Sequence, residues 1–135
     1  MKKKNSAAEA ANTARKRIEA AKRSFRLLYE GYEVHSRGWP DLLGFNRKTG
    51  TFYFIECKRI DEAADPLTED QQKVRKILKK IGKVENYDVW FFDKKKGSTK
   101  IIARAFYSRD RLHPYGVVRK NVKDKLRKLP NFVVD

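Results

Sequence analysis

Residues 41–58 read DLLGFNRKTGTFYFIECK, and the pattern of this stretch decides which fold we expect. Two strand-like runs, 41–45 and 51–58, flank the segment NRKTG at residues 46–50, which is typical of a hairpin connection. Both faces of the second run are largely apolar, so we expect it to be a central strand of a sheet. A hairpin of this kind also brings the residues at its open end together.

Three charged residues lie at that open end: Asp41, Glu56 and Lys58. Side chains alternate between the faces of a strand, so Glu56 and Lys58 share one face while Cys57 points to the other. With a four-residue loop at 47–50, Asp41 lies directly opposite Glu56; a three-residue loop would shift this register by one position. A carboxylate and an ammonium on a hydrophobic strand cost desolvation free energy, so we expect a partner that offsets it.

Two opposed carboxylates repel each other unless a cation lies between them. Oxygen ligands from such a pair suit Mg²⁺ or Mn²⁺, with Asp41 and Glu56 as the metal ligands. Lys58 would then project toward a bound phosphate or its attacking water, which suits metal-assisted hydrolysis of a phosphodiester. The alternative is a buried ion pair or triad of the same three side chains with no metal.

The charge of the chain favours a polyanionic partner. Its 135 residues include 33 Lys and Arg against 17 Asp and Glu, a net charge of +16. Residues 1–30 contribute +6 and residues 94–128 contribute +11, while residues 31–93 carry 11 charges of each sign. Two basic wings around a balanced centre predict binding to nucleic acid, driven largely by counterion release.

Composition also excludes several classes of protein. Cys57 is the single cysteine, so an internal disulfide and a cysteine-cluster zinc site are excluded. No apolar run approaches the roughly 20 residues of a membrane span, and no apolar segment follows the basic start of the chain. We therefore expect a cytoplasmic, nucleoid-associated protein with no membrane partner.

We expect one domain over residues 1–135, with a basic, partly mobile tail at 1–12, a catalytic core at 14–92 and a basic extension at 93–135. Apolar spacing and capping residues predict helices over 6–30, 68–82 and 118–129 and strands over 32–36, 87–92 and 100–107. This order predicts an α/β fold built around a mixed sheet.

On the helix at 68–82, apolar spacing predicts which face meets the sheet. Val74, Ile77 and Leu78 recur on one side of this helix, and Gln71 falls on the same side. By the same spacing, Gln72 turns away from the sheet.

The chain resembles a known group of nucleases. Trp39-Pro40-Asp41, followed after fourteen residues by Glu56-Cys57-Lys58, looks like the signature of the PD-(D/E)XK nuclease superfamily. Residues 38–42, 54–58 and 67–71 resemble the corresponding motifs of VRR-NUC domains and archaeal Holliday junction resolvase-like nucleases. The resemblance covers roughly residues 14–92 and implies a restriction-endonuclease-like αβββαβ core, with a mixed β-sheet flanked by helices.

The resemblance also implies roles for individual residues. Asp41 and Glu56 would bind the divalent metal, Glu56 or Lys58 would position and activate water, and Lys58 would stabilise charge in the transition state. Gln71 would join the site from the helix that follows, although Thr68-x-x-Gln71 is itself a capping box.

A glutamate of the first helix often completes such sites. Glu19 is in about the right place, with Glu30 and Glu33 behind it, and an ordinary solvated glutamate is the alternative. The predicted nucleic-acid contacts are the lysine-rich turn and two residues close to Asp41 in sequence: Lys94, Lys95, Lys96, Arg37 and His35.

These observations predict a divalent-metal-dependent endonuclease that cleaves DNA, with branched, nicked or otherwise structured DNA as substrate. Two alternatives stay open, a sequence-selective restriction-type endonuclease and a non-catalytic basic nucleic-acid-binding protein. Carboxylates opposed near phosphates favour an enzyme, because mere binding gains nothing from them. The resemblance to resolvases implies a homodimer, since two opposed strands must be cut.

Overall fold

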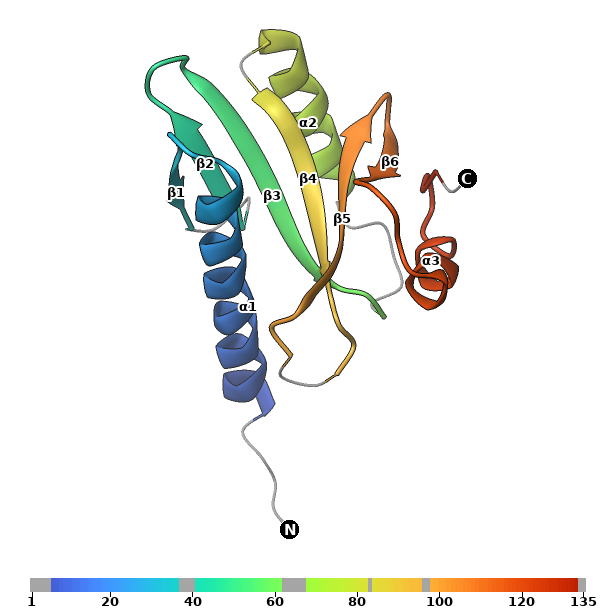
Figure 1. Ribbon diagram of the computed structural model, residues 1–135. Helices are drawn as coiled ribbons and strands as arrows, with labels where there is room; N and C mark the ends of the chain where they lie inside the picture. The colour runs from blue at the N-terminus through green and yellow to red at the C-terminus, as the bar shows by residue number, and fades with distance from the viewer. Residues whose placement is uncertain (1–5, 37–40, 62–67, 83, 96–97, 134–135) are drawn as a thin grey trace.

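The computed structural model of the protein describes residues 6–36, 41–61, 68–82, 84–95 and 98–133. In this described part of the chain, three helices and six strands follow one another (Figure 1): α1 (Ser6–Leu28), β1 (Glu33–His35), β2 (Leu42–Asn46), β3 (Thr51–Arg59), α2 (Glu69–Ile81), β4 (Val84–Phe92), β5 (Ile101–Ser108), β6 (Arg111–Pro114) and α3 (Lys120–Leu126). The helix–strand–strand–strand–helix–strand order expected from the sequence is confirmed.

All six strands form one sheet, in which spatial order follows chain order from β1 to β6. Every neighbouring pair is antiparallel except β3 and β4, which run parallel. The crossover between those two strands contains α2, because parallel neighbours cannot be joined by a tight turn. The α/β class with a mixed sheet is therefore confirmed, and β6 adds a strand that the sequence analysis did not predict.

One face of the sheet is covered by α1, which packs on the first three strands (Figure 1). Phe25 of α1 is fully buried against Leu42 and Ile55. Gly44 of β2 makes this approach possible, since a Cβ atom there would lie 2.8 Å from Phe25 Cε1 and closer still to Cζ. The opposite face of the sheet packs on α2 and α3.

The orientation of α2 differs from the one we predicted. Gln72 faces the sheet and donates to the hydroxyl of Tyr107 at 3.4 Å, and Arg75 is only 4% exposed with its guanidinium 4.6 Å from the Tyr107 ring centre. Val74 and Ile77 are exposed instead. The prediction that Gln72 turns away is wrong because Arg75, which the apolar spacing ignored, buries its guanidinium against an aromatic ring.

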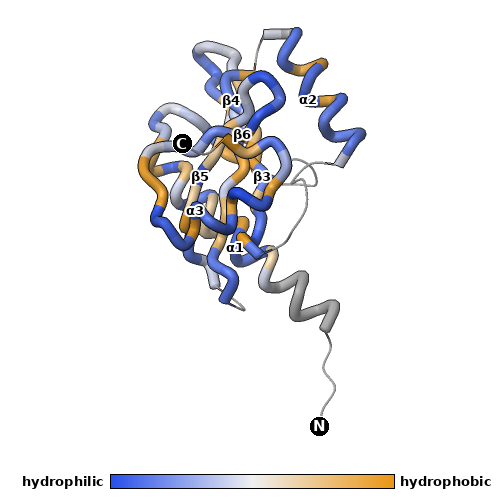
Figure 2. Tube along the Cα trace, turned by 90° about the vertical axis from the view of Figure 1, so that its right-hand side faces the viewer, coloured by the Kyte–Doolittle hydropathy of each residue, from blue (hydrophilic) through white to orange (hydrophobic). Residues whose placement is uncertain are grey.

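Figure 2 shows α2 as a largely hydrophilic helix with isolated hydrophobic positions. Arg75 is also ion-paired with Asp110, a residue that follows β5. A cation–ring contact and an ion pair therefore take the place of the apolar contacts that Val74 and Ile77 were expected to make.

Several boundaries also differ from those predicted. α1 begins at Ser6 as expected and ends at Leu28 rather than at residue 30, β4 begins at Val84 rather than at residue 87, and α3 covers Lys120–Leu126 rather than 118–129. Among the described residues, no helix is long and apolar enough to cross a membrane.

Candidate active site

The register of the β2–β3 hairpin brings Asp41 and Glu56 together. Pairing runs from Leu42 opposite Ile55 to Asn46 opposite Thr51, which leaves the four-residue loop 47–50. Continued by one position, this register places Asp41 opposite Glu56, and a direct contact confirms it: the Asp41 N–H donates to Glu56 Oε1 at 3.1 Å. Asp41 Oδ2 in turn accepts from the backbone N–H of Cys57 at 2.8 Å.

Both carboxyl groups lie in surroundings that disfavour their charge. Glu56 is 6% exposed, and burial together with the nearby Asp41 carboxylate raises its pKa to about 7. Burial also raises the pKa of Asp41, although the bond from Cys57 and the Lys58 ammonium oppose the shift. A cation placed between two such carboxyl groups would stabilise their ionised forms, because it offsets both their mutual repulsion and the cost of burial.

Lys58 is half-buried two positions beyond Glu56 on the same strand. Its ammonium favours the ionised forms of both Asp41 and Glu56, yet burial outweighs that effect in each case. No ion pair joins Lys58 to either carboxylate in the part of the chain that the structure describes. Among the described residues the three side chains therefore do not form a salt-bridged triad, and the choice between a metal site and a metal-free buried arrangement stays a prediction to be tested.

The donor set suits a hard divalent metal. Each carboxylate uses one oxygen for a backbone N–H, and the other oxygen, Asp41 Oδ1 or Glu56 Oε2, has no hydrogen bond to any described residue. Two such oxygens fit Mg²⁺ or Mn²⁺, which are bound through one or two carboxylates and retain several waters. Within the described ranges no cluster of three or more His, Cys, Asp or Glu is present.

Gln71 has an identified partner in the cap of α2. The Thr68 N–H donates to Gln71 Oε1 at 3.0 Å, and the Gln71 N–H donates to Thr68 Oγ1 at 3.2 Å. This is the capping box that the sequence analysis gave as the alternative role. A part for Gln71 in catalysis stays a prediction.

Glu19 is not brought to the carboxylate pair by any described contact. Its side chain is 52% exposed and forms an ion pair with Lys22 at 3.6 Å. It belongs to α1, which covers the face of the sheet opposite to that of Glu56. Its role in the site therefore also stays a prediction.

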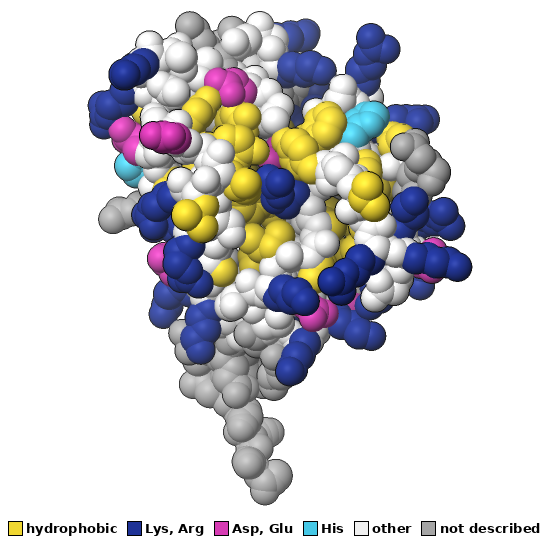
Figure 3. Space-filling model, in the orientation of Figure 1, with side chains coloured by type: hydrophobic (Ala, Val, Ile, Leu, Met, Phe, Trp, Pro, Cys, Tyr) yellow, Lys and Arg dark blue, Asp and Glu magenta, His cyan; other side chains and the backbone are white. Residues whose placement is uncertain are grey.

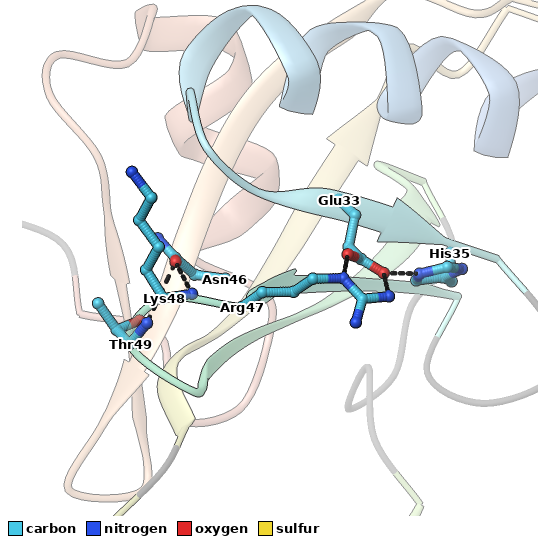
Figure 4. Close-up of polar contacts among 6 residues, drawn as sticks. All are labelled: Glu33, His35, Asn46, Arg47, Lys48 and Thr49. Carbon is cyan, nitrogen blue, oxygen red and sulfur yellow. Dashed lines mark hydrogen bonds and ion pairs between the residues drawn. The ribbon is translucent and has the colours of Figure 1, made fainter.

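His35 lies on the edge strand β1, where its ring contacts Glu33 at 2.9 Å (Figure 4). The same carboxylate is paired with Arg47 from the β2–β3 turn, so His35 belongs to a small surface cluster. Arg37 and Lys96, two of the other predicted nucleic-acid contacts, lie outside the described residues. Lys94 and Lys95 are exposed directly after β4.

One buried acid was missed by the sequence analysis. Asp88 of β4 is completely buried on the α1 side of the sheet, where it accepts from Trp90 Nε1 at 3.1 Å and from the Tyr115 hydroxyl at 2.9 Å. Burial raises its pKa to about 7, opposed by these two donors and by Arg104. A lone aspartate within the apolar run Tyr87–Phe92 was the signal that could have identified it.

Comparison with known proteins identifies the family of the chain. The family model of the VRR-NUC domain matches residues 2–89, which include α1, the β2–β3 hairpin, α2 and most of β4. No curated protein and no solved structure matches the chain. The matched segment ends before β5, so the last two strands and α3 lie outside it.

Proposed function

Because the chain belongs to the VRR-NUC family, within the PD-(D/E)XK nuclease-like superfamily, we propose that it is a divalent-metal-dependent endonuclease that hydrolyses phosphodiester bonds in DNA. The observation that carries the proposal is the partly buried contact between Asp41 and Glu56, which leaves one oxygen of each carboxylate available. Family membership indicates a nuclease acting on DNA, and the carboxylate pair supplies the reason for a metal.

Asp41 and Glu56 would hold the cation between them, and the backbone bonds fix the orientation of both carboxylates. A bound Mg²⁺ or Mn²⁺ would lower the pKa of an attacking water and neutralise charge on the phosphate. Lys58, on the same face as Glu56, would hold a proton on its Nζ and stabilise the negative charge that develops on the phosphoryl oxygens. Gln71 would orient water or metal from α2, whereas a part for Glu19 would require its side chain to reach the site from α1 on the opposite face of the sheet.

We further propose that the substrate is branched, nicked or otherwise structured DNA and that the protein acts as a homodimer. Cutting two opposed strands of a junction needs two sites related by symmetry, which a dimer supplies. The exposed lysines after β4 and the basic surface of α1 would bind phosphates without reading base sequence, a mode suited to recognition of DNA shape.

The test is a cleavage panel of linear, nicked, flapped, bubble and four-way-junction DNA, each with Mg²⁺, Mn²⁺ or EDTA. We expect cleavage only with a divalent metal and fastest on a structured substrate, with a dimer mass in sedimentation analysis. A junction made of RNA serves as the matched control for the sugar. Cleavage that persists in EDTA, or a wild-type protein inert with both metals, would contradict the proposal.

A further inference from the structure

A cavity of about 450 Å³ lies between the β4–β5 connection and α3. Four basic side chains line it: Lys94, Lys100, Arg119 and Lys125. Among the described lining residues, Asp93 is the acid. We call this cavity the α3 pocket. Apolar side chains of β5 and α3 complete its wall, so the cations lie around a partly hydrophobic hollow.

The four cations of the α3 pocket are not ion-paired with any acid among the described residues. Desolvation lowers the pKa of Lys125, and the ammonium of Lys94 lowers it further, against the opposing effect of Asp61 and Asp93. Like charges held together in this way favour a bound anion, which would relieve their repulsion.

The chain's topology puts the α3 pocket near the carboxylate pair. Parallel β3 and β4 end at the same edge of the sheet, where Lys58 is paired with Phe91 and Ile60 N–H bonds to Phe92. Asp93 follows at once and donates its N–H to Lys100. Because β3 and β5 are separated by one strand, their backbones lie about 10 Å apart at this edge.

α3 also lies on the same face of the sheet as Glu56. Val122 and Leu126 pack on Val89 and Phe91, side chains of the same sheet face as Glu56. One DNA strand running over this edge could therefore meet both the carboxylate pair and the α3 pocket. The pocket residues all lie beyond residue 89, outside the segment matched by the family model.

We propose that the α3 pocket binds a phosphate group of the DNA backbone a short distance from the phosphodiester that is cut. The Arg119 guanidinium can donate two parallel hydrogen bonds to phosphate oxygens, and the lysines supply compact charge around it. The inference rests on the proposed function, because it takes DNA as the ligand. It adds an anchoring site that belongs to this chain's C-terminal segment rather than to the family domain.

The experiment compares two triple variants with equal changes in charge. Lys100→Gln/Arg119→Gln/Lys125→Gln removes cations of the α3 pocket. The control removes one Arg and two Lys from exposed positions outside the pocket and outside α1: Arg109→Gln, Lys48→Gln and Lys80→Gln. Figure 3 shows why the control is needed, since Lys and Arg side chains are spread around much of the outline of the protein in that view. Binding of a fluorescent four-way junction is measured in EDTA over a range of salt concentrations, so that cleavage cannot interfere.

We expect the pocket variant to bind the junction at least about tenfold more weakly than the control variant. Its log–log salt dependence should be shallower by about 0.9 for each phosphate no longer neutralised. Lys125→Arg, which keeps the charge, should bind like wild type, and thermal melting should show that all variants are folded. Equal losses in the two triple variants would overturn the proposal, because they would reflect net charge alone.

A second arm distinguishes backbone phosphate from a free anion. Inorganic phosphate is titrated into isotope-labelled protein against chloride of equal ionic strength, with the amide signals of Ile102 and Val122 as reporters. If phosphate shifts these signals while the pocket variant binds DNA like the control, the pocket holds a free anion and the proposal fails. If wild type cleaves no DNA with either metal but the pocket variant still binds DNA more weakly than the control, the proposed nuclease function is wrong and the proposed phosphate site is supported.

Discussion

Asp41 and Glu56 are joined across the hairpin by a hydrogen bond from the Asp41 backbone to Glu56 Oε1, not by a bond between their carboxyl groups. Each carboxylate therefore keeps one oxygen for a metal. We expect Asp41→Asn and Glu56→Gln each to abolish single-turnover DNA cleavage in Mg²⁺, because each removes half of the charge that holds the cation. Fluorescence anisotropy should show DNA binding unchanged or tighter, since a negative group near the phosphates is lost.

Asp70→Asn is the matched control for these two variants, because Asp70 is an exposed acid at the start of α2. It should cleave at the wild-type rate. Full activity of either Asp41→Asn or Glu56→Gln would rule out the proposed metal site.

Lys58 separates the catalytic interpretation from a structural one. Its ammonium would balance charge that develops only in the transition state, so Lys58→Ala should lower the cleavage rate about 100- to 1,000-fold. Mn²⁺ affinity, measured by calorimetry, should stay near wild type, and Lys48→Ala at the exposed turn should leave both unchanged. A Lys58→Ala protein that unfolds would favour a structural ion pair instead.

Gln71 can be tested against its capping partner. The box formed with Thr68 predicts that Gln71→Ala and Thr68→Ala each lower the free energy of unfolding by about 1 kcal/mol. If Gln71 also acts in the site, its variant alone should lose cleavage rate well beyond the loss in Thr68→Ala. Equal cleavage rates in the two variants would restrict Gln71 to the cap.

Asp88 predicts a pH dependence of stability. Its pKa rises from 3.8 to about 7 on folding, so the folded state binds this proton more tightly than the unfolded state. The resulting stabilisation is complete below pH 3.8 and is lost as the pH rises through about 7. Asp88→Asn cannot titrate and should lack this loss.

Denaturant unfolding of wild type and Asp88→Asn at about pH 5 and about pH 8 measures the effect. The wild-type free energy of unfolding should fall by up to about 2–3 kcal/mol more than that of the variant. Glu56 titrates in both proteins, so its contribution cancels in the comparison. Parallel pH dependence in the two proteins would show that Asp88 keeps an ordinary pKa.

Gly44 tests the contact between α1 and the sheet. A methyl group there would overlap the Phe25 ring, which is fully buried, so Gly44→Ala should lower the free energy of unfolding by about 1–3 kcal/mol. Leucine is smaller than phenylalanine and leaves room for the added methyl group. Phe25→Leu should therefore lower the free energy of unfolding less in the Gly44→Ala background than in wild type. Additive losses in this double-mutant cycle would mean that the two residues do not compete for space.

The hairpin could be predicted from the sequence because its geometry is local. A four-residue loop fixes the register, and the register alone places Asp41 opposite Glu56. The expected faces of β3 are found as well: Phe54 packs with Tyr87 on one side, while Ile55 packs with Phe25 on the other. The alternation of side chains along a strand is enough to predict the two faces of β3, without knowledge of any long-range contact.

The features that could not be predicted depend on residues far apart in the chain. The rotation of α2 follows from the contacts of Arg75 with Tyr107 and Asp110, which lie 32 and 35 positions away. The α3 pocket likewise joins the β4–β5 connection to α3. A prediction from apolar periodicity places Arg75 in solvent. The lysine-rich sequence after β4 does not indicate which helix packs beside it.

The hairpin has a further consequence for how the chain folds. Asp41 and Glu56 are separated by 15 positions, whereas Glu56 and Val89, partners in the parallel pair, are separated by 33. Closing the shorter loop costs less entropy, so we expect the hairpin to form before β4 docks on β3 through the α2 crossover. The two carboxylates would then meet while still hydrated and lose their water only when β4 arrives. Refolding rates should accordingly be insensitive to Glu56→Gln, whose effect would fall on the rate of unfolding.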